Sequence, residues 1–217
     1  MLEGTRSGRS SLLRVAALDG IEQSEVRLRC TDGSAFDLPV QRWMGDPRPE
    51  ELSAIRNAPS PVLDVGCGTG RLVLALARRG VPALGLDTAP FAIHVGRARG
   101  ASILQRSIFD AVPGSGRWGS ALLFDGSIGI GGDPARLLRR LGGLVRAWGV
   151  ILVELDPDVS GLWRGRARIE RATACGPWFP WARVGPDAID AVAAQSGLGL
   201  VGRWEEGGRW FASLTRA

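Results

Sequence analysis

Lysine and tyrosine are absent from this chain of 217 residues, and histidine occurs once, as His94. Without lysine, the chain cannot contain the phosphate-binding loop motif, in which a lysine contacts the nucleotide phosphates. All 27 basic residues are therefore arginine, and the formal net charge is +5. Because a GC-rich genome favours arginine as readily as a nucleic-acid surface does, this charge does not by itself predict an RNA or DNA partner.

Cysteine is also scarce, and long apolar runs are missing. Cys30, Cys67 and Cys175 are odd in number and far apart, so we expect neither a disulfide framework nor a metal site. No apolar run approaches the length that spans a bilayer. The stretch Leu12–Leu18 is interrupted by Arg14 and no cleavage site of small residues follows it, so we expect no signal peptide and a cytoplasmic location.

The most informative segment is Val62–Gly70, which reads VLDVGCGTG. An apolar run leads through an acid to three glycines at alternate positions, and an amphipathic segment starts at Arg71. The pattern predicts a buried strand, a tight turn and the start of a helix. Glycine permits positive φ and lets a ligand approach the backbone closely. Asp64 adds a negative charge beside the turn, which favours a ligand with positive groups over a pyrophosphate.

The spacing of these glycines excludes the dinucleotide fingerprint, because G-x-G-x-x-G counted from Gly66 needs a glycine where Arg71 stands. The segment DVGCGTG instead resembles the first motif of class I S-adenosylmethionine-dependent methyltransferases. That family has a second acid at the end of the next strand, where this chain has Asp87 after Val81–Leu86. The resemblance implies that Asp87 binds the adenosine ribose; capping the helix predicted at Pro90–Arg99 is the alternative role.

A third, shorter match follows the strand predicted at 102–105. There the resemblance implies that Asp110 accepts the adenine amino group and that Ile108 and Phe109 flank the ring; a turn role for Asp110 is the alternative. The implied cofactor is S-adenosylmethionine, with S-adenosylhomocysteine as its product. Its predicted binding residues are Asp64, Gly66, Cys67, Gly68, Gly70, Asp87, Thr88, Ser107, Ile108, Phe109 and Asp110.

Strand and helix patterns alternate along the chain and predict a doubly wound α/β fold. The family resemblance implies a mostly parallel seven-stranded sheet whose last strand is antiparallel. Residues 1–59 are predicted to form an N-terminal extension with a hairpin and a short helix, for which a lid over the cofactor is one interpretation. Residues 60–217 are predicted to form the methyltransferase domain. The predicted strands are 26–30, 35–40, 62–65, 82–86, 102–105, 120–124, 149–155, 198–204 and 210–214, and the predicted helices are 50–56, 70–79, 90–99, 133–147 and 186–195.

The loop after the fourth central strand is where the family offers clues to the methyl acceptor. Methyl transfer from a sulfonium is a direct displacement that needs an aligned nucleophile more than a fixed catalytic residue. Enzymes that methylate the amines of nucleic-acid bases usually carry an N/D-P-P-aromatic tetrad there, whereas this chain has Asp125-Gly126-Ser127-Ile128. Asp125 is the candidate catalytic residue, and holding the loop in place is its alternative role.

The segment Gly161–Val184 is rich in tryptophan and arginine. Trp178 and Trp181, with Asp125 and Ser127, are the predicted substrate contacts, although the tryptophans could equally close the core. Arginines at 164, 166 and 168 alternate with other residues, which favours the solvent face of a strand over a comb of phosphate-binding groups.

We therefore predict a cytoplasmic methyltransferase that acts on a small molecule and has neither a nucleic-acid nor a membrane partner. An rRNA or tRNA methyltransferase and a non-catalytic partner protein with the methyltransferase fold are the alternatives.

Overall fold

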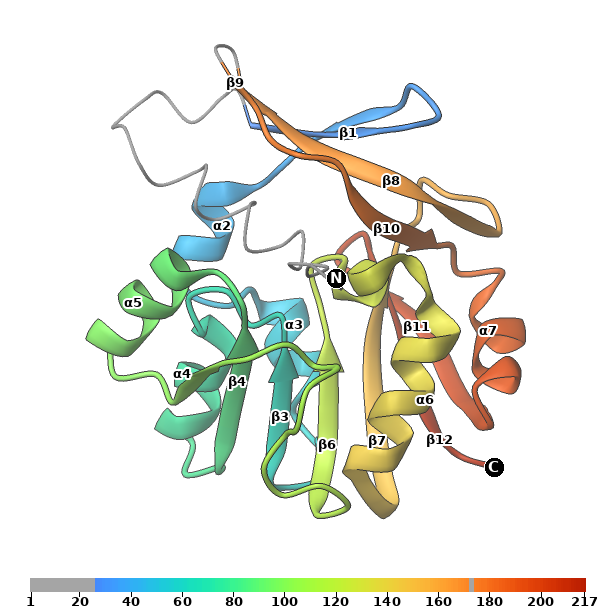
Figure 1. Cartoon of the computed structure of the whole chain (residues 1–217). Helices are drawn as coiled ribbons and strands as arrows, with labels where there is room; N and C mark the ends of the chain where they lie inside the picture. Colours follow the sequence, from blue (N-terminus) through green and yellow to red (C-terminus); the bar gives the residue numbers. More distant parts are fainter. Residues whose placement is uncertain (1–25, 172–173) are drawn as a thin grey trace.

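The computed structural model of the protein describes residues 26–171 and 174–217. The predicted N-terminal stretch Leu12–Leu18 lies outside the described residues. Seven strands form a central sheet in the order β11-β12-β7-β6-β3-β4-β5 (Figure 1). Their bounds are β3 Val62–Val65, β4 Ala83–Asp87, β5 Ile103–Gln105, β6 Trp118–Leu123, β7 Val145–Leu155, β11 Leu198–Glu206 and β12 Arg209–Arg216.

The pairing of these strands is parallel except at one edge. β3 pairs in parallel with β4 and β6, β4 with β5, and β6 with β7. The last strand, β12, runs antiparallel to both β7 and β11. The predicted mostly parallel seven-stranded sheet with an antiparallel last strand is therefore confirmed. Because the five parallel strands point the same way, their carboxyl ends meet at one edge of the sheet (Figure 1).

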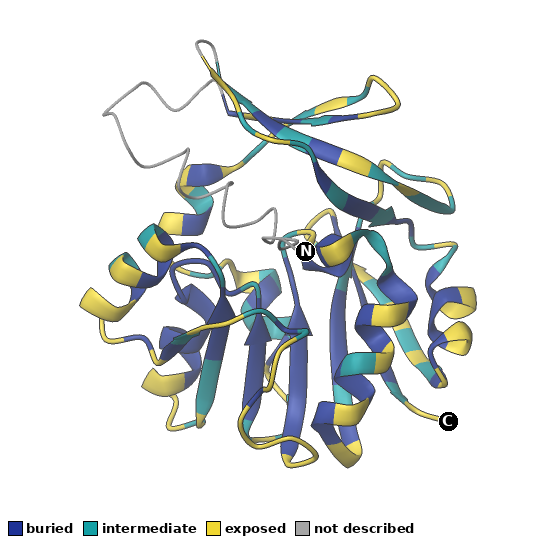
Figure 2. Ribbon diagram, in the orientation of Figure 1, coloured by how far each residue is buried: buried dark blue, intermediate teal, exposed yellow. Residues whose placement is uncertain are grey.

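Helices cover both faces of the central sheet, and alternate residues of each strand belong to different apolar clusters. This is expected because successive side chains of a strand point to opposite faces. Figure 2 shows the central strands as the most continuously buried part of the molecule. One cluster contains Val62, Leu122, Leu152 and Phe211 with α3 (Pro49–Ala54) and α4 (Arg71–Arg78), and the other contains Leu63, Leu123, Val153 and Ala212 with α6 (Pro134–Leu144) and α7 (Ile189–Gln195).

The helix after β4 and its neighbours form a third, smaller cluster. α5 (Pro90–Ala98) contributes Ile93, which packs with Val73 of α4 and Ile103 of β5. His94 on the same helix is exposed. None of the helices in the described ranges is both long and apolar enough to cross a membrane.

The predicted boundary between α6 and β7 is wrong. The helix predicted over 133–147 ends at Leu144, and β7 begins at Val145 instead of near 149. Val145 is fully buried and pairs with Trp118 of β6. This long-range pairing overrides the local pattern, and Gly142 and Gly143 weaken the helix just before it.

The remaining strands form a second sheet, which we call the upper sheet. It has the order β10-β8-β1-β2, with β9 beside β8. The predicted hairpin around Asp32-Gly33 is present, although its second strand stops at Asp37 and α2 (Val40–Met44) begins where the strand was predicted to continue. Pro39 lies between them and has no N–H to extend the ladder. The bounds are β1 Arg27–Cys30, β2 Ala35–Asp37, β8 Leu162–Arg171, β9 Ala174–Cys175 and β10 Phe179–Val184.

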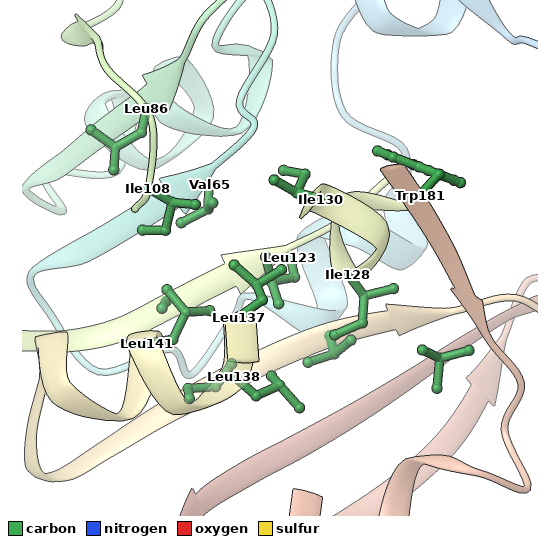
Figure 3. Packing of buried hydrophobic residues seen from close by; sticks show 14 of the residues in the cluster. Val65, Leu86, Ile108, Leu123, Ile128, Ile130, Leu137, Leu138, Leu141 and Trp181 are labelled. Atoms are coloured by element: carbon green, nitrogen blue, oxygen red, sulfur yellow. The ribbon is translucent and has the colours of Figure 1, made fainter. Parts of the chain in front are cut away.

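The upper sheet lies over the edge where the central strands end (Figure 1). The contact is made by β10 and the short helix η2 (Ser127–Gly132), which follows β6. Figure 3 shows Ile128 and Ile130 of η2 near Leu137 and Leu138 of α6, with Trp181 of β10 beyond them. The N-terminal hairpin and the chain after β7 therefore share one sheet, while the predicted division of the chain at residue 59 stays a prediction.

The approach of β10 to η2 depends on Gly129. A Cβ at this position would lie 2.2 Å from Ala182 O and 2.8 Å from Trp181 Cε2. We expect Gly129→Ala to lower the free energy of unfolding by about 1–3 kcal/mol, because the two sheets must separate to admit the methyl group. Urea unfolding measures this change. Gly143→Ala is the matched control, since a Cβ on this α6 residue has no neighbour within 4 Å. An equal loss of stability in both variants would contradict the role assigned to Gly129.

Candidate functional site

The glycine turn between β3 and α4 adopts the backbone conformation that its sequence predicts. Gly66, Gly68 and Gly70 have φ values of 70°, 58° and 73°, which glycine adopts without steric cost. The N–H groups of Gly66 and Cys67 donate to Leu86 O at 2.8 and 3.1 Å. These bonds hold the turn against the carboxyl end of β4.

Two residues of the turn have packing roles. The Cys67 side chain belongs to the apolar cluster with Val73 and Ile93. A Cβ at Gly70 would lie 2.8 Å from Ala101 Cβ, so a glycine is needed for the turn to lie close to the start of β5. Cofactor contacts predicted for Cys67 and Gly70 would therefore use their backbone atoms.

Asp87 is the last residue of β4 and only 3% exposed. Its Oδ2 accepts the N–H of Gly68 at 2.8 Å, and its Oδ1 accepts the N–H groups of Thr88 and Ala89 at 2.7 and 2.8 Å. One carboxylate thus joins the glycine turn to the loop that leads into α5. The bond to Ala89, the N-cap of α5, shows that the helix-capping interpretation of Asp87 also has a basis in the structure.

A small cavity opens beside Asp87, where the carboxyl ends of β3, β4 and β5 meet. It brings together five of the predicted cofactor residues, namely Gly66, Asp87, Thr88, Ser107 and Ile108. Arg106 and apolar side chains from β3, β4 and η2 complete its wall, and Figure 3 shows three of the apolar ones with Ile108. The apolar members of the wall are Val65, Leu86, Ile108 and Ile130.

Six predicted cofactor residues are not among those that line this cavity: Cys67, Gly68 and Gly70 of the turn, and Asp64, Phe109 and Asp110. The Phe109 ring lies 4.7 Å from the Arg136 guanidinium. Asp110 is exposed, and its backbone O accepts a hydrogen bond from Arg140 Nη2 at 2.6 Å. Asp64 is 3% exposed within β3. Their predicted roles stay predictions.

A group of paired charges, which we call the buried charge network, lies on the other side of the glycine turn. It contains three arginines and three acids, so its formal charges cancel. Its members come from α2, α3, α4, the loop after β6 and the two neighbouring strands β7 and β12. They are Arg42, Glu51, Arg71, Asp125, Glu154 and Arg209.

Arg71 lies at the centre of this network and is 4% exposed. Its Nη2 donates to Glu51 Oε1 and to Asp125 Oδ2, both at 2.5 Å, and its Nη1 donates to Glu51 Oε2. Burial acts to lower the pKa of Arg71, but the bonds to Glu51 and the two negative charges outweigh it and raise that pKa. Burial likewise acts to raise the pKa of Glu51, and Arg71 outweighs it, so the pKa of Glu51 is lowered.

Arg209 connects β12 to the same group. Its Nε and Nη2 donate to Glu154 Oε1 and Oε2 at 2.8 and 2.6 Å, and its Nη1 lies 2.5 Å from Glu51 Oε1. Burial raises the pKa of Glu154, and the nearby charge of Asp125 adds to the effect despite the opposing influence of Arg209. The paired acids raise the pKa of Arg209 against the effect of its burial.

Asp125, the predicted catalytic residue, has an unusual backbone conformation. Its φ is 53°, and it is the one non-glycine residue in the described ranges with positive φ. Its N–H donates to Glu154 Oε2 at 2.6 Å, and its carboxylate pairs with Arg42, Arg71 and Arg209. These contacts match the alternative role of holding the loop in place, while its catalytic role stays a prediction.

A larger cavity of about 320 Å³ lies between the central and upper sheets. Asp125 and Trp181, two of the predicted substrate contacts, are part of its wall. Ser127 is buried in η2. Trp178 is not among the lining residues, and its ring packs under the Arg168 guanidinium at 4.8 Å.

The alternating arginines lie on β8, as the strand interpretation predicts. Arg164 Nη2 lies 3.3 Å from Asp133 Oδ1, and Arg166 Nη2 donates to Trp178 O at 2.9 Å. Arg168 pairs with Glu170 on the same strand. All three therefore have partners within the protein, so a phosphate would have to compete with them.

Sequence patterns do not predict the buried charge network. Its members are far apart in the chain, and nothing in the local sequence indicates that Glu51 or Arg209 would be buried. One signal does exist: Arg71 is a charged residue at the start of the helix segment RLVLALAR, where apolar residues occupy most of the other positions. A buried arginine requires an acidic partner, but the pattern does not say which acid it is.

Removing the central arginine tests how far the fold depends on the network. We expect Arg71→Met to lower the free energy of unfolding by about 3–5 kcal/mol, because Glu51 and Asp125 would lose their partner while buried. Chemical denaturation measures the loss. Arg78→Met on the same helix is the matched control, because Arg78 pairs with Asp46 in an exposed position. Similar losses of unfolding free energy in the two variants would contradict the claim that the buried pairs of Arg71 stabilise the fold more than the exposed pair of Arg78.

The lowered pKa of Glu51 predicts that the free energy of unfolding depends on pH in the acidic range. Its pKa is below the ordinary 4.5 in the folded protein, so its ionised form stabilises the fold above pH 4.5, and this contribution is lost as the pH falls through the lowered pKa. The difference in unfolding free energy between wild type and Glu51→Gln should therefore be constant near neutral pH and shrink below pH 4.5. Urea unfolding as a function of pH measures it, and a constant difference down to pH 2.5 would contradict this assignment.

The sequence matches known proteins over part of its length. Residues 62–123 match the family described as "Methyltransferase domain". A curated relative, the 2-heptyl-1-hydroxyquinolin-4(1H)-one methyltransferase of Mycobacteroides abscessus, is 45% identical over 56 residues. The matched segment is a quarter of this chain and a quarter of that relative.

Solved structures resemble the chain over a much greater length. A methyltransferase from Bacteroides fragilis, crystallised with S-adenosyl-L-homocysteine, has a TM-score of 0.76 at 23% identity and covers 100% of this chain and 98% of its own. The CcbJ methyltransferase of Streptomyces caelestis has a TM-score of 0.62 at 15% identity, with coverages of 81% and 92%. Residues 62–123 thus resemble a methyltransferase domain in sequence, and the described residues share the fold of solved S-adenosylmethionine-dependent methyltransferases.

Proposed function

We propose that the protein binds S-adenosylmethionine at the glycine turn and transfers its methyl group to a small-molecule acceptor. The observation that carries this proposal is the position of Asp87, a buried carboxylate at the edge where three parallel strands end, hydrogen-bonded to the glycine turn. The Bacteroides fragilis protein of the same fold was crystallised with S-adenosyl-L-homocysteine, and CalS10 of Micromonospora echinaspora with S-adenosylmethionine.

The donor and acceptor groups around Asp87 fit the nucleoside part of such a cofactor. A carboxylate offers about four acceptor positions, and the three N–H groups of Gly68, Thr88 and Ala89 occupy three of them. One hydrogen-bond acceptor position of the Asp87 carboxylate therefore remains for a ribose hydroxyl. Ile108 and Ile130 provide an apolar wall beside this position, and the cavity that they line, about 20 Å³ in this structure, would have to widen to admit an adenine ring.

The proposed reaction requires alignment and exclusion of water. When bound, S-adenosylmethionine supplies a methyl group on a positively charged sulfur; the acceptor's lone pair forms the new bond to carbon while the carbon–sulfur bond breaks and its electrons return to sulfur. The glycine turn and Asp87 would orient S-adenosylmethionine, and the upper sheet would exclude water from the cavity that holds the methyl acceptor. The network holds Asp125 between these two regions, so its loop is well placed to position the acceptor.

The size of the larger cavity supports a small acceptor. About 320 Å³ lies within the range of pockets that bind small molecules. Among proteins of similar fold, CalS10 is an amino pentose methyltransferase and another is a Burkholderia thailandensis 1,6-didemethyltoxoflavin-N1-methyltransferase. The pairing of Arg164, Arg166 and Arg168 within the protein argues against the RNA alternative.

Cofactor affinity tests the proposal directly. We expect wild-type protein to bind S-adenosylhomocysteine, and Asp87→Ala to weaken binding roughly 10- to 100-fold, about 1.5–3 kcal/mol for hydrogen bonds to a charged acceptor. Isothermal titration calorimetry measures both affinities. Asp46→Ala is the control, because Asp46 is exposed and far from the turn in the sequence.

Two results would count against the proposal. Wild-type protein that does not bind S-adenosylhomocysteine would contradict the enzyme assignment and favour the non-catalytic alternative. Salt-sensitive binding of the folded protein to transfer or ribosomal RNA would favour the RNA alternative. Urea unfolding of Asp87→Ala separates loss of a ligand contact from loss of the fold, because this carboxylate also supports three backbone N–H groups.

A further inference from the structure

We propose that the cavity between the two sheets binds an organic cation, a compound with an apolar ring and a protonated amine, and that Asp158 recognises the positive charge. The inference rests on the proposed function, since the compound would be the methyl acceptor. It goes further by stating the charge of the compound and the residue that selects it.

The charged residues in the cavity wall form ion pairs, with one exception among them. These pairs are Arg42 with Asp125, Glu154 with Arg209 behind the wall, and Arg183 with Asp156. Asp158 is the exception, because it is exposed and its carboxylate has no ion-pair partner within residues 26–171 and 174–217. The paired charges cancel, so the wall keeps one uncompensated negative charge, which a ligand can reach from solvent.

Asp158 lies on the turn that follows β7 and leads to the upper sheet. Its N–H donates to Asp156 Oδ1 at 3.1 Å, and Asp156 Oδ2 accepts a hydrogen bond from Arg183 Nε at 2.6 Å. The turn thus carries two carboxylates, and one arginine pairs with them. A ligand cation beside this turn is therefore attracted by more negative than positive charge.

Apart from these charged groups, the wall of the cavity is apolar. Leu28 and Phe36 contribute from the upper sheet, Ile128 from η2 and Trp181 from β10. Trp181 also packs edge-on against Phe179 with ring centroids 5.9 Å apart, so its ring is held in position. A volume of about 320 Å³ with two aromatic walls suits one or two fused rings, whose charged substituent can stay at the exposed turn.

Neither an anion nor an uncharged compound fits this wall as well. An anion would be repelled by Asp158, and it would have to take Arg42 or Arg183 from the acids that they already bind. An uncharged compound would leave Asp158 without a charged partner. Because a protonated nitrogen has no free lone pair, the amine is the group that is recognised, and a different atom of the compound accepts the methyl group.

Matched naphthalene compounds test the proposal by equilibrium dialysis at neutral pH with S-adenosylhomocysteine present. 1-Naphthylmethylamine carries an ammonium group, 1-naphthylmethanol is an uncharged compound of similar shape, and 1-naphthoate is negatively charged. We expect the amine to bind about fivefold more tightly than the alcohol, since an exposed ion pair contributes modestly, and the naphthoate to bind most weakly. The preference for the amine should shrink as salt is added, because salt screens an exposed charge.

Three variants make the outcome decisive. Asp158→Asn should abolish the preference for the amine over the alcohol, and Asp158→Lys should make the naphthoate bind more tightly than the amine. Asp190→Asn is the matched control, because Asp190 is exposed on α7 and is not among the residues that line the cavity, and it should retain the full preference.

A fourth variant tests whether the compounds bind inside the cavity. Leu38→Trp adds an indole at the half-exposed edge of the cavity and should weaken binding of the amine and the alcohol alike. Equal binding of amine and alcohol to the wild type, an unchanged preference in Asp158→Asn, no reversal in Asp158→Lys, or undiminished binding in Leu38→Trp would overturn the inference. Loss of the preference in Asp190→Asn would overturn it as well.

The same samples separate this inference from the proposed function. If S-adenosylhomocysteine binds and the amine does not bind as described, only the inference about the acceptor fails. If S-adenosylhomocysteine does not bind, the proposed function fails, whatever the naphthalene compounds do.

Discussion

The buried charge network is the constraint on which the arrangement of the site depends. Three arginines and three acids from six segments of the chain meet where little water reaches. Removing a charge from water costs on the order of several kcal/mol, so this packing is favourable only when each group finds its partners. The network therefore joins α2 and α3 to α4, β7 and β12. It also holds Asp125 in a backbone conformation that few non-glycine residues adopt.

A second consequence is that the upper sheet and the glycine turn cannot be positioned independently. α2 follows the hairpin of the upper sheet, contributes Arg42 to the network and accepts the Thr69 hydroxyl through its backbone. On the opposite side, Gly129 lets β10 pack directly on η2. The cavity between the sheets is thus bounded by elements that are tied to the loop beside Asp87. The proposed cofactor site and the proposed site for the methyl acceptor are therefore held in place by the same elements.

The central sheet was predictable because its signals are local. Alternation of apolar side chains, apolar runs of strand length and the glycine turn at Gly66–Gly70 depend on neighbouring residues. In the upper sheet, the hairpin and the strand with the alternating arginines were predictable, but their pairing was not, because Leu28 of β1 pairs with Ile169 of β8 across more than half the chain. The same reason explains the error at Val145, where pairing with Trp118 begins the strand earlier than the local pattern suggests.

The sequence by itself determined the glycine turn, the acid after the second central strand and therefore the predicted cofactor class. These features depend on backbone conformations that a few consecutive residues impose. Only the tertiary structure decided which side chains surround Asp125 and which side chains line the larger cavity. Glu51 and Arg71 are 20 residues apart, and Asp125 and Arg209 are 84 apart. Such partners are selected by the cost of leaving a buried charge unpaired, and that cost arises only after the chain has folded.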